Sequence, residues 1–501
     1  MAGGGALAVV RLQPSPCRAP ERELDQVWNL KTRSQLGAEF SNFREAARQW
    51  PFVEKALDRA AERWLAAYAY VCGSRESRRE SEAAIQLRLD CLGRQRDAFA
   101  VVVETLGSSD PLLFHSPVAV VGTLPAPMEC SDARALPLTE HLPPEKARQV
   151  LALRARLARI KARSQLTRDG VLEELQAIQK EARELGSEAV EAEANYFEGG
   201  HLSSIGDTKA SLGAYRRAIE IADVEHLDVL AARAAATLVG NTAFAGGTKE
   251  EVDAQVEPAR RRVERAGNSP LAQQALEHSL GSVMEIRGRA AEALPHMQRA
   301  LELQREISGA ESLGVLLELN NLGSVYQDLG RDDDSVATLR EAIVLSDRLV
   351  GPDRDNLRIV WVNLAWALGD LGRGSEARQA AEHAMKEPPD AYSDIGLAII
   401  AHASVIDGRS QEGLVTAERA LALMERLKIE NQQEGREVLR RCAIAYLRGG
   451  RVSDAVGLVE RLLASAKPQL EENSPNWVPF LSVAGEAYVA ARQPKRAEEL
   501  L

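Results

Sequence analysis

The sequence predicts an all-α protein in which a four-helix N-terminal domain precedes a solenoid of helical repeats. Two observations carry this prediction. A pattern occurs twice between Leu313 and Met385, with corresponding residues 42 positions apart, and a fixed period in this range is typical of helical repeat arrays. In addition, the 501-residue chain has 45% hydrophobic, 27% charged and only 4% aromatic residues, with an abundance of strong helix formers.

Each copy of the pattern predicts a helix–turn–helix unit. In the first copy, Leu322, Gly323 and Tyr326 share one face of a helix. Gly330 ends that helix, because a residue without Cβ readily takes the left-handed conformation, and a second helix begins near Asp333. Such a unit cannot bury its apolar face alone and has to stack on its neighbours. The second copy contains Leu364-Ala365, Leu368, Gly372-Arg373, Ala377 and Ala384.

Residues 1–16 contain the apolar stretch Met1 to Val10, which is too short to span a bilayer. It lacks the basic leader and cleavage site of a signal peptide. Two interpretations stay open: a disordered terminus, or the stub of a membrane helix lost from this chain, which would be the only membrane tether. The net charge of −11 argues against nucleic acid as a partner, since neutralising phosphates requires a basic face.

Residues 17–142 form a repeat-free, cysteine-bearing region with helices expected near 20–47, 50–71, 77–106 and 110–121. Pro51 is expected at the start of the second helix, and Asp110-Pro111 at the start of the fourth. Four of the five cysteines lie in this region. Antiparallel hairpins would bring Cys17 beside Cys72 and Cys91 beside Cys130. Four reduced thiols in a cytosolic bundle are the alternative, because disulfides are rare in the cytosol.

A proline-rich loop from Leu136 to Pro144 precedes a linker hairpin, assigned to residues 143–186, with its turn at Asp169-Gly170. Residues 187–501 form the repeat array, with about 7–8 units and the last one incomplete. Glu257-Pro258 is expected to interrupt one second helix. The array is placed by its turn glycines, Gly206, Gly246, Gly288, Gly330, Gly372, Gly408 and Gly450, which are spaced by 40, 42, 42, 42, 36 and 42 residues. Arginine follows the last five of these glycines.

The block from Leu319 to Arg331 closely resembles the tetratricopeptide repeat (TPR), in the long-helix form of kinesin light chain. The resemblance implies a right-handed superhelix with a concave groove that holds a protein or peptide segment. A second resemblance comes from Trp28, Trp64, Cys72, the run Leu87 to Leu92, and Cys130-Ser131-Asp132. These residues are similar to the region that joins kinase to repeats in membrane-spanning serine/threonine kinases of the myxobacterial type.

The kinase motifs themselves are missing from the sequence: there is no Gly-rich phosphate loop, His-Arg-Asp loop or Asp-Phe-Gly motif. By resemblance the chain is the sensory part of such a bacterial system. Disulfides would place it on the extracytoplasmic side of the membrane, and reduced thiols would place it in the cytoplasm. Neither catalytic residues nor a cofactor site are predicted. A metal site is not expected either, because the eight histidines lack metal-binding spacing. Cys442 is expected to be a packed core thiol.

The resemblance to peptide-binding repeats implies that Asn321 and Asn363 face the groove and offer a donor and an acceptor to an extended backbone. Trp366 would supply an aromatic platform, and Arg440 with Arg441 a site for a carboxylate. The alternative is that the asparagines bond neighbouring helices and that Trp366 belongs to the core. The candidate groove residues are Asn321, Ser324, Gln327, Asn363, Trp366, His402, Arg440 and Arg441.

Three functions are therefore weighed. The first is a non-catalytic scaffold or sensor that binds a peptide or protein in kinase-linked signalling. The second is part of a kinase whose catalytic domain lies outside this chain. The third is a structural array that self-associates through its uncapped C-terminal end.

Overall fold

The computed structural model is all-α, as predicted: helices make up 84% of it, and no strand occurs in the part of the chain described here. The described residues are 17, 20–77, 80–108, 117–124, 127–130, 144–164, 167–349, 358–385, 391–430, 433–467 and 478–500. The chain divides into two compact units, Met1–Val190 and Glu191–Leu501, with the division inside helix α8. Each unit is considered by itself.

The first unit is built around two long helices, α3 (Arg44–Glu76) and α4 (Glu82–Leu106), which pack against each other. The short helices α1 (Pro20–Asp25) and α2 (Leu30–Ser41) pack on α3. Two further short segments, α5 (Pro117–Val121) and the 3-10 turn η2 (Pro127–Cys130), contact both long helices. Two indole N–H groups tie this unit together: Trp28 Nε1 donates to Asp58 Oδ1 (2.8 Å) and Trp64 Nε1 to the Leu92 carbonyl (2.9 Å).

The helix boundaries in this unit correct two predictions. The single helix expected over 20–47 is broken, because Asn29 caps a new helix by accepting a hydrogen bond from the Thr32 N–H at 3.0 Å. Pro51 lies inside α3 rather than at its start. Its missing N–H costs one backbone hydrogen bond, but the flanking turns bury Ala46 and Val53 completely, and this packing keeps the helix continuous. Asp110-Pro111 lie outside the described residues.

The predicted hairpin is present as α6 (Pro144–Arg163) and α7 (Val171–Leu185), with Gly170 in the left-handed conformation (φ 68°) between them. Helix α6 packs against α4, and both hairpin helices fall in the first unit. The hairpin is therefore packed onto α4 through α6. The finer division of the chain at residues 142 and 186 stays a prediction.

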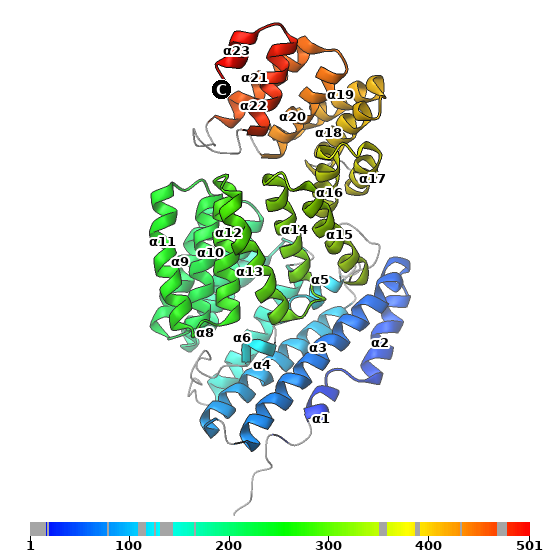
Figure 1. Ribbon diagram of the computed structural model, residues 1–501. Coiled ribbons are helices and arrows are strands. Elements are labelled where there is room, and N and C mark those ends of the chain that lie inside the picture. Colours follow the sequence, from blue (N-terminus) through cyan, green and yellow to red (C-terminus); the bar gives the residue numbers. More distant parts are fainter. Residues whose placement is uncertain are drawn as a thin grey trace, which may run out of the picture. The chain divides into compact units, whose positions relative to one another are not determined.

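The second unit consists of consecutive helix pairs stacked as a solenoid, which Figure 1 shows in green to red. The pairs are α8 (Glu188–Ser204) with α9 (Thr208–Val224), α10 (Asp228–Phe244) with α11 (Lys249–Arg265), α12 (Pro270–Ile286) with α13 (Ala290–Ser308), α14 (Leu313–Asp328) with α15 (Asp332–Leu349), α16 (Arg358–Asp370) with α17 (Gly374–Ala384), α18 (Ala391–Ile406) with α19 (Ser410–Leu427), α20 (Gln433–Arg448) with α21 (Val452–Ala466), and α22 (Val478–Ala490) with α23 (Pro494–Glu498). From α9 to α23, helices that are neighbours in the chain pack against each other, and hydrogen bonds from Ser211 and Arg217 join α9 to α8.

The turns between paired helices confirm the glycine prediction. All seven predicted turn glycines have positive φ, between 66° and 84°. At Gly330 the backbone forms a Schellman motif: the Gly330 N–H donates to the Gln327 carbonyl and the Arg331 N–H to the Tyr326 carbonyl, both at 2.8 Å. These bonds satisfy carbonyl groups that a helix end leaves without partners.

The arginine after each of the last five turn glycines has a local role that the sequence pattern did not reveal. Arg331 Nε donates to Asp334 Oδ2 at 2.7 Å, and its guanidinium lies over the Tyr326 ring at 4.7 Å. Arg451 does the same with Asp454 (2.6 Å) and Tyr446 (4.6 Å). Arg289, Arg373 and Arg409 pair likewise with the acidic residue three positions on. Arg331 and Arg451 therefore link the end of one helix to the first turn of the next.

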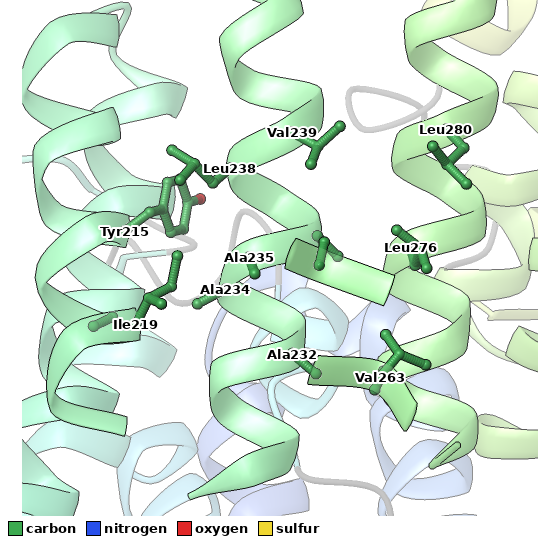
Figure 2. Packing of buried hydrophobic residues seen from close by; sticks show 14 of the residues in the cluster. Tyr215, Ile219, Ala232, Ala234, Ala235, Leu238, Val239, Val263, Leu276 and Leu280 are labelled. Atoms are coloured by element: carbon green, nitrogen blue, oxygen red, sulfur yellow. The ribbon is translucent and has the colours of Figure 1, made fainter. Parts of the chain in front are cut away.

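One predicted interruption is wrong: α11 runs continuously through Pro258. The helix begins at a complete capping box formed by Thr248 and Glu251. It is held by a core in which α10 contributes mainly alanines, while Tyr215 and Ile219 come from α9 and Leu276 and Leu280 from α12 (Figure 2). Because its side chains are small, α10 packs closely against α9, α11 and α12.

Candidate functional site

The candidate site lies on the first helices of the repeat units, where equivalent positions recur from helix to helix. Nine residues before each turn glycine lies one row, and six residues before it lies another on the same helix face. From α12 to α20 the first row is Ser279, Asn321, Asn363, Ile399 and Arg441, and the second is Ser282, Ser324, Trp366, His402 and Ile444. The two rows contain six of the eight candidate residues.

The asparagines differ in their surroundings. Asn321 is partly exposed, whereas Asn363 is buried and its Nδ2 donates to Asn320 Oδ1 at 3.0 Å. The Asn363 carbonyl in turn accepts a hydrogen bond from Gln327 Nε2 at 3.0 Å. Asn363 and Gln327 thus join α14 to α16, which is the interhelical role that the sequence left as the alternative. Asn321 keeps a surface from which it could meet a partner.

Ser324 is also used between helices, because its hydroxyl donates to Glu285 Oε1 of α12 at 2.6 Å. A second polar link joins the same two helices: Gln274 Nε2 and His278 Nδ1 both contact Glu318 Oε1, at 2.9 and 3.0 Å. Although burial opposes the charged form, the hydrogen bond to Glu318 raises the pKa of His278. Polar side chains therefore hold the first helices of successive units in register.

Trp366, His402, Arg440 and Arg441 come together, although they lie on three different helices. Both guanidinium groups lie over the Trp366 ring, at 6.0 Å for Arg440 and 5.4 Å for Arg441. Arg441 Nη1 lies 3.1 Å from His402 Nδ1. Trp366 itself is partly exposed.

The two arginines are neutralised by carboxylates that the sequence prediction did not include. Glu437 accepts hydrogen bonds from Arg440 at 2.9 Å and contacts Arg441 as well. Asp370 Oδ2 accepts from Arg441 Nη2 at 3.2 Å. We call Asp370, His402, Glu437, Arg440 and Arg441 the Arg441 cluster; it holds two positive and two negative charges around a histidine.

Burial decides what the Arg441 cluster can do. Arg441 has 0% of its surface exposed, so a direct contact between its guanidinium and a partner's carboxylate, as predicted, is not offered by this geometry. Burial, and then the positive charges of Arg441 and Arg440, lower the pKa of His402 to about 3. Burial opposes ionisation of Asp370, but Arg441 and Arg440 hold its pKa below the usual value. The cluster therefore positions Trp366 and joins α16, α18 and α20.

A signal for this cluster was present in the sequence at Gly369. A Cβ added there would lie 2.9 Å from Arg441 Nη1, so the absence of a side chain makes room for the guanidinium. The pairing could not be read from the repeat register, because Asp370 and Glu437 lie 67 residues apart on non-equivalent positions.

The predicted cysteine pairs lie at disulfide distance in the first unit. The sulfur atoms of Cys17 and Cys72 are 2.07 Å apart and those of Cys91 and Cys130 are 1.98 Å apart. Arg88 fixes the second pair from inside the unit: it is 1% exposed, and its Nε donates to the Cys130 carbonyl at 3.1 Å. Cys442 is a buried free thiol, as expected, and burial raises its pKa.

Two absences concern the described residues alone. In that part of the chain no helix combines the length and apolar character needed to cross a membrane. There is also no cluster of three or more histidine, cysteine, aspartate or glutamate side chains arranged to hold a metal ion among those residues.

Comparison with known families supports the interpretation of the second unit. The family model described as tetratricopeptide repeat matches residues 271–343 and again 315–386, a region that runs from α12 to α17. The chain therefore contains tetratricopeptide repeats. The comparisons support the TPRs but give no support for the resemblance of the cysteine-bearing region to kinase-linked proteins.

Solved structures similar to this chain include TPR proteins from several organisms. One structure contains the nearly identical TPR-like repeats of a candidate kinesin light chain from Podosopora anserina. It shares 19% sequence identity with this chain, covers 40% of this chain and 99% of that one, and has a TM-score of 0.31. A TPR protein from Parabacteroides merdae is 14% identical, covering 59% and 91%, with a TM-score of 0.35.

A signal transduction ATPase with numerous domains from Pyrococcus horikoshii, which has a TPR sensor, is 12% identical, covering 81% of this chain and 52% of that one, with a TM-score of 0.37. A search of the curated proteins gave no match. At these identities and TM-scores the likenesses carry no inference about function.

Proposed function

We propose that the TPR array is a non-catalytic module that binds an extended segment of a partner protein along its first helices. The observation that carries this proposal is the register of partly exposed residues, Asn321, Ser324 and Trp366, on consecutive first helices. An asparagine amide both donates to and accepts from a peptide backbone. An aromatic ring held by two guanidinium groups gives a rigid apolar platform.

The roles differ from those first expected. Asn321 and Trp366 are the contact residues of the proposal. Asn363, Gln327 and the Arg441 cluster are positioning residues, because their polar groups already bond within the array. The surface that the segment binds would thus be preorganised, so that ordering its side chains would cost little binding free energy.

The test begins with a display library of random dodecapeptides selected against the purified full chain. Affinities of the selected peptides are then measured for the wild type, Asn321→Ala and Trp366→Leu, with Asp347→Ala on the outer surface of α15 as the matched control. Loss of a hydrogen bond or of the aromatic platform should weaken binding about five- to thirty-fold, since each is worth about 1–2 kcal/mol. Failure to select any binder, or equal affinities in all variants, would reject the proposal.

A narrower form of the proposal assigns the chain to kinase-linked bacterial signalling as a sensing or scaffolding part. Its support is the resemblance of residues 17–140 together with the two cysteine pairs at disulfide distance, which favour an oxidising compartment outside the cytoplasm. The competing function, a part of an active kinase, predicts phosphate incorporation when the purified chain is incubated with labelled ATP. Incorporation would overturn the scaffold assignment, and none is expected.

A further inference from the structure

A third row of equivalent residues lies two positions before each turn glycine. This position follows the Asn321 position by seven residues, or about two helical turns, so it lies on the same helix face. We call this row the Asp328 row. Its members, from α10 to α20, are Phe244, Ile286, Asp328, Asp370, Ile406 and Arg448.

Large apolar side chains in this row are exposed. Phe244 has 80% of its surface exposed, Ile286 has 42% and Ile406 has 39%. Single exposed apolar residues are common on proteins, but their recurrence at one position of successive units is typical of a surface that a partner covers. Ile286 and Ile406 flank the two aspartates, so the row has an acidic centre between apolar neighbours, and Arg448 follows at its C-terminal end.

The two central aspartates differ in one respect. Asp370 belongs to the Arg441 cluster and is neutralised there. Asp328 is exposed and has no ion pair among the described residues, and its charged neighbour is another carboxylate, Glu285. The side chain as a whole is exposed, but the protein around its carboxyl group, followed by the charge of Glu285, raises the pKa of Asp328. A partner's cation beside Asp328 would stabilise the ionised carboxylate, because its positive charge offsets both the desolvation and the repulsion by Glu285.

We propose that the Asp328 row binds an extended segment in which a lysine or arginine lies opposite Asp328, between apolar side chains that cover Ile286 and Ile406. This inference rests on the proposed function and names the chemistry of the partner. The occupant is a segment of another protein, because the row needs a cation at its centre and apolar groups at both sides.

The geometry of the stack sets the spacing of those side chains. First helices that pack directly, as α14 with α16 and α16 with α18 do, lie roughly 8–10 Å apart. An extended chain advances about 3.3 Å per residue, so one helix step corresponds to about three residues. Side-chain hydrogen bonds join α12 to α14, so we assign Ile286 one step from Asp328, and Ile406 is two steps away on the other side. The segment should therefore carry an apolar residue about three positions before the cation and another about six positions after it, or the same pattern in reverse.

The peptides selected from the dodecapeptide library test this pattern. We expect enrichment of lysine or arginine with apolar residues at those two spacings. Asp328→Lys should weaken these peptides at least ten-fold and shift a new selection toward aspartate or glutamate at the central position. Asp328→Asn, which preserves shape and removes charge, should give an intermediate loss. Asp347→Lys, an equal charge reversal on α15, should leave affinity unchanged.

The outcomes separate this inference from the function beneath it. If peptides bind and Asn321→Ala weakens them, but no cation is enriched or Asp328→Lys has no effect, the inference is wrong and the proposed function stands. If no peptide binds the wild type, the proposed function itself fails. If light scattering shows a wild-type dimer that Asp328→Lys converts to a monomer, the occupant is a second copy of this chain, and the inference is overturned.

Discussion

At the residue scale, Arg441 shows how a repeat array accommodates a charge inside its stack. Its guanidinium is fully buried, yet Glu437, Asp370 and His402 surround it. Buried ion pairs are costly to desolvate, and removing one partner leaves an uncompensated charge. The contribution of Arg441 is therefore to the alignment of α16, α18 and α20 beneath Trp366.

Arg441→Met should lower the free energy of unfolding by about 3 kcal/mol, because the buried Glu437 and the more exposed Asp370 would each lose one of their two arginine partners and keep only Arg440. Arg289→Met removes an exposed pair with Glu292 and should cost less than about 1 kcal/mol. Urea unfolding of both variants checks this. Equal losses in the two variants would contradict the role given to the Arg441 cluster.

Asp394 is a second buried ionisable group, and no neighbouring charge in the described part of the chain compensates its ionised form. It is 0% exposed, and neither carboxyl oxygen has a hydrogen-bond partner among the described residues. Burial raises its pKa from 3.8 to about 8. The folded state thus binds a proton between about pH 4 and 8 that the unfolded state has released, and stability falls as the pH rises through this window.

Asp394→Asn should remove that loss. Between pH 6.5 and pH 9 the wild type should lose about 2 kcal/mol of its free energy of unfolding, because about 1.5 pH units of the window lie above pH 6.5 and each corresponds to about 1.4 kcal/mol. The variant lacks this loss, so its free energy of unfolding should rise by that amount relative to the wild type. His402 does not interfere with this measurement. Its pKa is about 3 in the folded state and about 6.5 in the unfolded state, so it changes the free energy of unfolding only below about pH 6.5, where stability falls as the pH falls. Chemical denaturation at the two pH values measures the difference, and a constant gap would show that Asp394 is ionised in the folded state.

Residue positions were easier to predict than residue partners. The 42-residue period placed Asn321, Ser324 and Trp366 on equivalent helix faces, because helical spacing alone fixes which residues share a face. Partners depend on side-chain reach across helices. The sequence could not show that Asn363 bonds to Asn320 or that Glu437 neutralises Arg441.

At the element scale, the turns are the most predictable part of the fold. A glycine at the end of each first helix is required by a backbone conformation that other residues adopt at a cost, so its spacing could be read directly. Helix interiors were less predictable at Pro51 and Pro258, because tertiary packing outweighs the loss of one hydrogen bond. The break between α1 and α2 was missed because it depends on a cap at Asn29 rather than on hydrophobic spacing.

Two glycine substitutions test this view of the turns. Gly330→Ala should destabilise the array by about 1–2 kcal/mol, because φ is 66° there and a Cβ would meet no atom within 4 Å, leaving backbone strain as the cause. Gly457→Ala, also with no atom within 4 Å but inside α21, should stabilise it by about 0.5–1 kcal/mol. Thermal unfolding followed by circular dichroism distinguishes the two. A stabilising Gly330→Ala would contradict the assigned turn conformation.

At the scale of the whole molecule, the all-α class followed from composition and period, since both are averages over many residues. The N-terminal unit was harder to predict because it has no internal repeat. Its cysteine pairing was reached from hairpin geometry, and the structure places the same pairs together.

The two cysteine pairs should stabilise the first unit, and this effect can be tested. They close segments with sequence separations of 55 and 39 residues, and in the chain-entropy account each would stabilise the unit by about 4 kcal/mol. Reduction of the full chain should therefore lower the unfolding midpoint of the first unit while leaving that of the TPRs unchanged. A thiol assay in denaturant without reductant should find one free thiol, from Cys442; five thiols would show that neither bond forms.

The short second helix α17, which lies between two longer ones, also has a consequence. Helix α17 has 11 residues, whereas α15 and α19 have 18 each. Because each unit of a solenoid touches only its neighbours, tension at the two ends is carried in series, as in a spring. Helix α17 has fewer residues with which to contact its neighbours than α15 or α19, so we expect the stack to yield there, between Asp370 and Ile406. Force applied to the two ends of the protein would thus separate the helices along which we place the partner segment, and it would lower the affinity for that segment.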